Sequence, residues 1–164
     1  MRFSQITAIL SITAVASAQV TFNLTKAYKK GNWDKYHCLD AVKVKTWIPK
    51  CLHECQDKAN RADGCAFNDY ACHCINNSVY SKLIEPCAFP AAMGGKGTCK
   101  MADLRVARPI VQDICNFFNA TIYSDYHGCK QKLSREKTFG MVRKQKFIAI
   151  DSEYDEDRLH YETD

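Results

Sequence analysis

The sequence has no apolar run that approaches the ~20 residues a membrane-spanning helix needs. It also lacks a phosphate-binding loop, because the glycine-rich stretch at residues 93–97 carries only part of that pattern. Low-complexity composition is missing as well: 46% of the 164 residues are hydrophobic and 25% are charged. These proportions are ordinary for globular proteins and argue against a disordered or fibrous chain. We therefore expect a soluble, folded protein.

The first 18 residues have the features of a secretory signal peptide. Met1 and Arg2 form a short basic start, residues 6–15 are weakly apolar, and Ala16-Ser17-Ala18 suits cleavage after small residues. Cleavage there would reduce 164 residues to 146, which is enough for one domain. The charged ending at residues 158–164 predicts neither a membrane anchor nor a GPI signal. We expect a secreted, extracellular protein, and entry into a host cell stays open.

Ten cysteines are present, none of them before Cys38. In an oxidising secretory pathway this even number predicts five disulfides. The alternative is a metal-thiolate site, suggested by Cys72-His73-Cys74 and by His37-Cys38. Oxidation outside the cell disfavours it, because thiolate ligands would have to survive there. Three N-x-[ST] sequons, at Asn23, Asn76 and Asn119, are consistent with a glycoprotein.

Charge is separated along the chain. Residues 19–150 contain 21 lysines and arginines against 11 aspartates and glutamates, whereas residues 151–164 contain seven acids and one arginine. Seven of the bases lie between Lys130 and Lys146, with only Glu136 opposing them. We interpret residues 120–150 as a basic extension and residues 151–164 as a disordered acidic tail. The two blocks could neutralise each other, or the basic block could bind an anionic partner or act as a nuclear address.

Hydrophobic spacing predicts a mainly α fold. Helices are expected over Lys50–Arg61, Asn76–Ile84 with Pro86 and Pro90 closing the unit, and Ala102–Phe118 with Pro109 as a kink or boundary. In the last of these, Leu104, Val111, Cys115 and Phe118 mark one face. Residues 19–48 are interpreted as an irregular arm, extended at the start where Val20, Phe22 and Leu24 alternate.

Cys51 and Cys55 lie four residues apart in the first predicted helix. Their Cβ atoms would be about 5–6 Å apart, too far for the ~3.8 Å of a disulfide, so we expect each cysteine to bridge to a different element.

The order of eight cysteines resembles the CFEM family of cysteine-rich fungal extracellular modules. The spacing is Cys51-x3-Cys55-x9-Cys65-x6-Cys72-x-Cys74-x12-Cys87, followed by Cys99-x15-Cys115, with Pro49 ahead of it. The eleven residues between Cys87 and Cys99 exceed the usual few and predict an enlarged loop. We assign residues 49–119 to this module. Cys38 and Cys129 fall outside it and are predicted to pair with each other. Hydrophobins and plant-type lipid-transfer proteins are disfavoured, because both use adjacent Cys-Cys pairs that this sequence lacks.

The resemblance implies a compact helical basket held by four disulfides, with a flat apolar platform for ferric haem. Family haem binders carry an aspartate as axial iron ligand three residues before the Cys-x-Cys pair, where this chain has Asp69. The alternative for Asp69 is a turn or helix-capping carboxylate. Five neighbours could line the haem or belong to the core: Phe67, Tyr70, Tyr80, Leu83 and Phe89.

These features predict a secreted fungal effector acting in host interaction and virulence, with a host protein as partner and with ferric haem as a ligand. The alternative is a secreted haem scavenger or relay for iron acquisition. We do not expect an enzyme, because no nucleophile, histidine and acid arrangement is recognisable. Nucleic-acid binding is not predicted either, since Phe139 is the only aromatic residue between Lys130 and Lys146.

Overall fold

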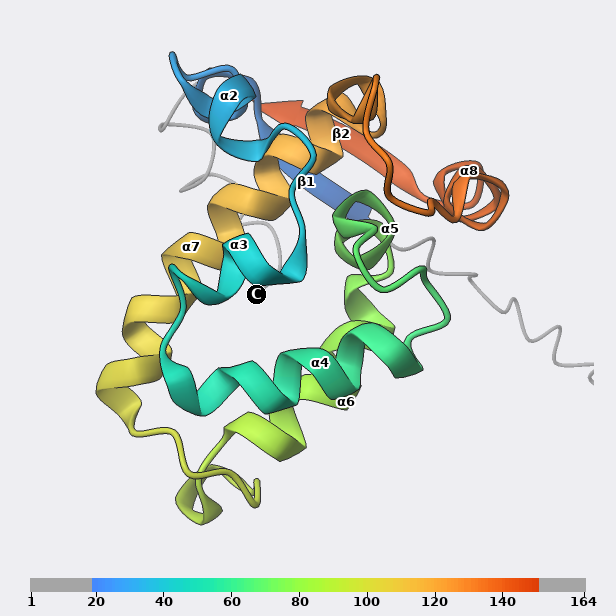
Figure 1. Ribbon diagram of the computed structural model, residues 1–164. Helices are drawn as coiled ribbons and strands as arrows, with labels where there is room; N and C mark the ends of the chain where they lie inside the picture. The colour runs from blue at the N-terminus through green and yellow to red at the C-terminus, as the bar shows by residue number, and fades with distance from the viewer. Residues whose placement is uncertain (1–18, 151–164) are drawn as a thin grey trace, which may run out of the picture.

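The computed structural model describes residues 19–150, and these residues are mainly helical, as predicted (Figure 1). The predicted signal peptide and acidic tail lie outside the described residues. The elements, in chain order, are β1 (Gln19–Asn23), α1 (Leu24–Ala27), α2 (Asn32–Tyr36), α3 (Ala41–Lys45), α4 (His53–Ala62), α5 (Tyr70–Ile75), α6 (Asn77–Ala88), α7 (Met101–Thr121), α8 (Arg135–Val142) and β2 (Lys146–Ile150). Three short 3₁₀ turns connect them, at Lys50–Leu52, Ala91–Met93 and Ser124–Tyr126.

The N-terminal arm is extended only over β1, so the expectation of an irregular arm is wrong for most of its length. Three short helices follow because capping side chains start two of them: the Asn23 side chain accepts from the Lys26 N–H, and the Asp40 side chain accepts from the Lys43 N–H, both at 2.8 Å. The arm then contributes buried residues, among them Tyr36 and Leu39, to the common core.

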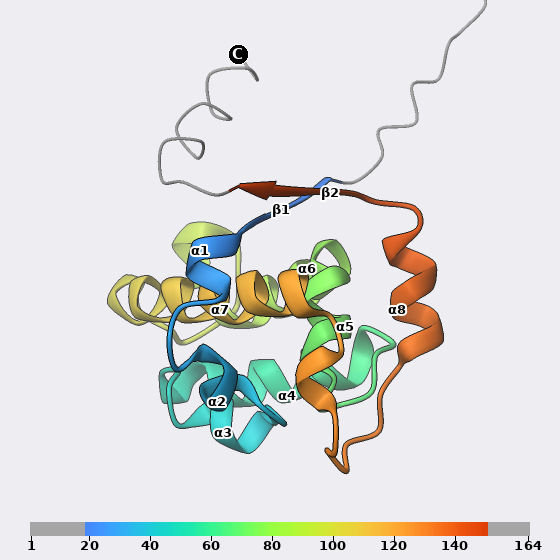
Figure 2. The ribbon, with the colours of Figure 1, turned by 90° about the horizontal axis from the view of Figure 1, so that it is seen from above.

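The basic extension is an ordered part of the domain. Its strand β2 runs parallel to β1, pairing Gln19 with Lys146 and Asn23 with Ile150. Figure 2 shows this two-stranded sheet lying beside α1 and α7, with α8 at the edge of the helical bundle next to α5. The apolar segment at residues 147–150, the one place where the apolar content recovers after Cys129, explains why this part of the chain packs.

Two of the three prolines expected to end or interrupt helices lie within them, whereas Pro90 lies beyond the end of α6. Pro109 is part of the continuous 21-residue helix α7, and Pro86 is in the last turn of α6. Each proline removes one backbone donor, and both are exposed, so the opposite face of the helix still packs. On α7 that face includes Phe117 and Phe118, which are 1% and 0% exposed. Helix α7 ends at Thr121, before Ile122, whose φ of 53° is outside the helical region.

Five disulfides join all ten cysteines. Cys51 and Cys55 bridge to different elements, as predicted: Cys51 joins the loop before α7, and Cys55 joins α6. The pairs are Cys38–Cys129, Cys51–Cys99, Cys55–Cys87, Cys65–Cys72 and Cys74–Cys115. Because no cysteine is free, neither thiolate metal set considered from the sequence is available.

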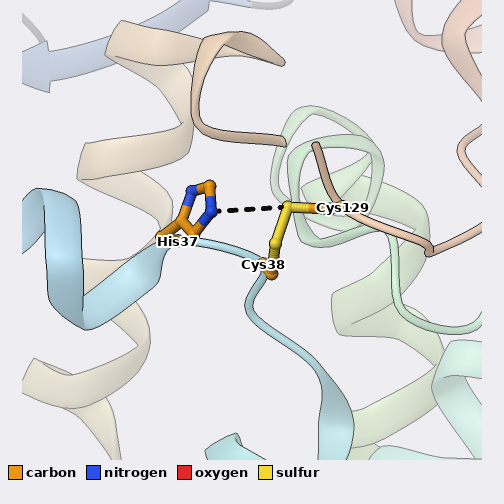
Figure 3. Close-up of side chains that lie close together, drawn as sticks. All are labelled: His37, Cys38 and Cys129. Atoms are coloured by element: carbon orange, nitrogen blue, oxygen red, sulfur yellow. Dashed lines mark hydrogen bonds between the residues drawn. A yellow bond between two sulfur atoms is a disulfide. The ribbon is translucent and has the colours of Figure 1, made fainter. Parts of the chain in front are cut away.

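The Cys38–Cys129 bridge is the pairing that the sequence predicts for the two cysteines outside the module. It ties the segment between α2 and α3 to the start of the basic extension, across a sequence separation of 91 residues. Figure 3 shows the bridge beside His37, whose Nε2 atom lies 4.0 Å from the Cys129 sulfur.

Candidate functional site

Asp69, the candidate haem ligand, is a fully buried helix cap. Its side chain has 0% exposed surface and precedes the first residue of α5. One carboxylate oxygen, Oδ1, accepts a hydrogen bond from the Cys72 N–H at 3.0 Å, and the backbone carbonyl accepts from the His73 N–H, also at 3.0 Å. Capping satisfies a helix donor that would otherwise lack a partner. Of the two roles considered for Asp69 from the sequence, iron ligand and helix-capping carboxylate, this geometry shows the helix cap.

The second carboxylate oxygen of Asp69 binds the C-terminal extension. Oδ2 accepts from the Ser134 N–H at 2.6 Å and from the Tyr123 hydroxyl at 2.9 Å. The Tyr123 hydroxyl also contacts the Thr138 hydroxyl at 2.5 Å, and the Ser134 hydroxyl accepts from the Ala66 N–H at 2.8 Å. Residues 120–150 thus cover the loop between Cys65 and Cys72. They form hydrogen bonds with Ala66 near its start and with Asp69 near its end.

In this arrangement Asp69 does not fit an axial iron ligand. Both carboxylate oxygens already accept hydrogen bonds, from three donors together, and no part of the side chain reaches the surface. An iron atom could reach it only after Tyr123 and Ser134 had moved away. The sequence gives no signal for these two partners, because they lie 54 and 65 residues further along the chain and outside the module.

His73, the histidine nearest to Asp69 in the sequence, is also fully engaged. Its Nδ1 lies 2.7 Å from Asp63 Oδ2, and its Nε2 lies 3.2 Å from the Phe67 carbonyl oxygen. Each ring nitrogen of His73 thus lies within hydrogen-bond distance of a protein oxygen atom. Asp63 is held in turn by the Cys65 N–H at 2.9 Å. This buried pair fixes the start of the Cys65–Cys72 loop.

Burial raises the pKa of three acidic groups in the extension, Tyr123, Asp125 and Tyr126. It raises the pKa of the Tyr123 hydroxyl, which therefore stays protonated and donates to Asp69. It also raises the pKa of Asp125 to about 7, and the Oδ2 atom of this carboxyl group has no hydrogen-bond partner among the described residues. A carboxyl group with this pKa is about half protonated at neutral pH, which lowers the cost of burying it.

The asparagines of two of the three sequons are buried in this structure, which disfavours a glycan at these positions. Asn23 is 3% exposed and Asn76 is 7% exposed. The Asn76 side-chain nitrogen, to which a glycan would be attached, donates to the Asp63 carbonyl at 2.9 Å. Asn119 is half-buried and stays a candidate.

The five aromatic and apolar residues near Asp69 separate into different surroundings. Phe67 lies beside Asn68 on an open hollow that also includes Lys132 and Ser134. Three of the five, Tyr70, Tyr80 and Phe89, line a different and more apolar pocket, of which Asp69 is not part. Leu83 lines neither cavity. The structure therefore does not gather the five around the carboxylate.

Comparison with known proteins identifies the cysteine-rich part of the chain. Residues 45–116 match the family model of the CFEM domain. This region is a CFEM domain. It contains the eight cysteines of the predicted module, and their four bridges are all internal to it. No curated protein and no solved structure matches the chain.

The CFEM family is fungal and, in general, extracellular. Within residues 19–150, no helix combines the length and apolar character that a membrane span requires. The CFEM domain of this chain is accompanied by an ordered arm and an ordered extension, which are joined to each other by the Cys38–Cys129 bridge and by the β1–β2 pairing.

Proposed function

We propose that this protein is secreted and acts as a fungal effector, in which the CFEM domain is a disulfide-braced scaffold for binding a host protein. The observation that carries the proposal is the closure of Asp69 by the extension. A domain that captures and releases haem needs an accessible iron ligand, whereas a scaffold needs a rigid and protease-resistant fold. Five disulfides in about 130 described residues supply the second requirement.

The positive charge of the basic extension favours a partner with an acidic surface. All seven of its basic residues are exposed, and none forms an ion pair with an acid among residues 19–150. They are Lys130, Lys132, Arg135, Lys137, Arg143, Lys144 and Lys146. Exposed charges of one sign speed the encounter with a partner of the opposite sign. A host protein with an acidic surface is the partner that these exposed charges favour.

Haem capture is the second candidate, and the CFEM family resemblance favours it. It would require the extension to release Asp69, because Tyr123 and Ser134 occupy the oxygen that faces away from the helix cap. In that case the chain would bind haem only in a conformation different from the one described.

Charge reversal in the extension tests the effector proposal. Deletion of the gene is expected to reduce host colonisation, and a variant with Lys130, Lys132, Arg143 and Lys144 changed to Glu is expected not to restore it, because the acidic partner would be repelled. The matched control changes four exposed lysines elsewhere, Lys29, Lys30, Lys82 and Lys96, to Glu and is expected to restore colonisation. If deletion affected growth on haem as the sole iron source and left colonisation intact, the proposal would be wrong.

A further inference from the structure

A partly enclosed apolar pocket lies between α3, α4, α6 and α7, which surround the middle of the view in Figure 1. Its volume is about 670 Å³, within the range of sites that hold small organic molecules. Its apolar lining includes Ile48, Leu52, Ile84, Phe89, Leu104 and Val111. These residues come from three separate segments that the CFEM disulfides hold together, so the pocket is a built feature of the domain.

One face of α7 lines this pocket and is not fully covered by other residues of the range 19–150. Leu104, Val111 and Cys115 mark the face that the sequence predicts to be apolar, and all three line the pocket. Val111 is nevertheless 45% exposed. Met93 and Met101 flank the opening, at 44% and 45% exposed. Flexible thioether side chains at an opening adapt to apolar ligands of different shapes.

A buried acceptor without a donor lines the same pocket. Gln56, on α4, is 3% exposed, and its side-chain nitrogen donates to the Tyr70 hydroxyl at 2.6 Å. Its side-chain oxygen, Oε1, has no hydrogen-bond partner among the described residues. Buried polar atoms in folded proteins almost always have a partner. An O–H or N–H group of a bound molecule would supply the missing donor.

The remaining polar groups restrict the class of ligand. Asp69 does not line the pocket, and the ring nitrogens of His73, which does, are occupied by Asp63 and the Phe67 carbonyl. The charged lining residues, Glu85, Arg105 and Arg108, are exposed at the surface, so the buried lining presents no unpaired charge. An uncharged molecule with one donor group matches this lining, because a buried charge would lack a partner.

We propose that this pocket binds an uncharged lipid with a single hydroxyl group, such as a long-chain alcohol or a sterol. The hydroxyl donates to Gln56 Oε1, and the hydrocarbon part lies along Leu104 and Val111 toward the methionines at the opening. This binding is independent of Asp69 and of the basic extension, so it does not rest on the effector proposal.

Fluorescence displacement on the purified, oxidised protein tests the proposal. The uncharged fluorophore N-phenylnaphthylamine, whose emission rises in apolar surroundings, reports occupancy, and dodecanol and dodecyl methyl ether compete with it. These competitors have similar apolar chains, but only dodecanol has a hydroxyl donor. We expect dodecanol to displace the fluorophore at a concentration about five- to tenfold lower than the ether. The Gln56→Leu variant should remove this difference, because no acceptor is left for the hydroxyl.

Two valines on α7 provide a matched pair of variants. Val111 lines the pocket, whereas Val106, which is 55% exposed, does not. Val111→Arg should weaken fluorophore binding by about tenfold or more, and Val106→Arg should leave it unchanged. Circular dichroism and urea unfolding show whether each variant is folded. The proposal is overturned if the wild type does not raise the emission, if both arginine variants bind equally, or if dodecanol and the ether compete equally.

Discussion

Replacing Asp69 with alanine is expected to lower the free energy of unfolding by about 3–5 kcal/mol. The carboxylate is fully buried and accepts from the Cys72 N–H, the Ser134 N–H and the Tyr123 hydroxyl. Its removal leaves the Cys72 and Ser134 N–H groups without their acceptor, whereas the Tyr123 hydroxyl can still donate to Thr138, and unsatisfied buried donors cost about 1–3 kcal/mol each. Urea unfolding under oxidising conditions measures the change.

The Asp69→Asn variant separates the two roles of the carboxylate. The amide oxygen can still cap α5, but the amide nitrogen cannot accept from the Ser134 N–H. We expect a loss smaller than that of Asp69→Ala, with the remaining loss due to the contact with the extension. A decrease below about 1 kcal/mol for Asp69→Ala would show that the carboxylate is not enclosed by these donors.

Removing the Cys38–Cys129 bridge by a double serine substitution is expected to destabilise the protein by about 4.6 kcal/mol, because the bridge closes a loop of 91 residues. Chain entropy gives only about 2.4 kcal/mol for the Cys65–Cys72 bridge, with its separation of seven residues. The Cys65→Ser/Cys72→Ser protein is therefore the control, and urea unfolding of the two variants measures the difference.

Loss of the Cys38–Cys129 bridge should also be visible in the hydrogen exchange of the extension. This bridge and the β1–β2 pairing hold the extension over the CFEM domain. Its loss should raise hydrogen exchange at Ser134 and Thr138, the residues next to Asp69 and Tyr123. Equal stability of the two double variants, with unchanged exchange at Ser134, would contradict the account of the extension as a covering segment.

The CFEM domain was predictable from the sequence because its signals are local. Cysteine spacing reveals the module directly, and a helical repeat of apolar residues predicts α4, α6 and α7 to within a few residues. The helices of the arm are only four or five residues long, too short for a periodic pattern, and depend on caps such as Asn23 and Asp40.

The role of Asp69 was not predictable, because it depends on contacts between distant segments. A capping aspartate and a ligating aspartate occupy the same sequence position, and the difference here comes from Tyr123 and Ser134 in the extension. For the same reason the sequence could not place Val111. Periodicity assigns it to an apolar face, whereas only the tertiary fold shows that this face lines a pocket and not the closed core.

Titration of the oxidised protein with ferric haem, followed at the Soret band, tests directly whether the extension closes Asp69 to ligands. We expect the wild type and the folded Asp69→Asn variant to give the same spectrum, with no band that depends on the carboxylate. A shifted Soret band in the wild type that disappears in the folded Asp69→Asn variant would contradict this expectation.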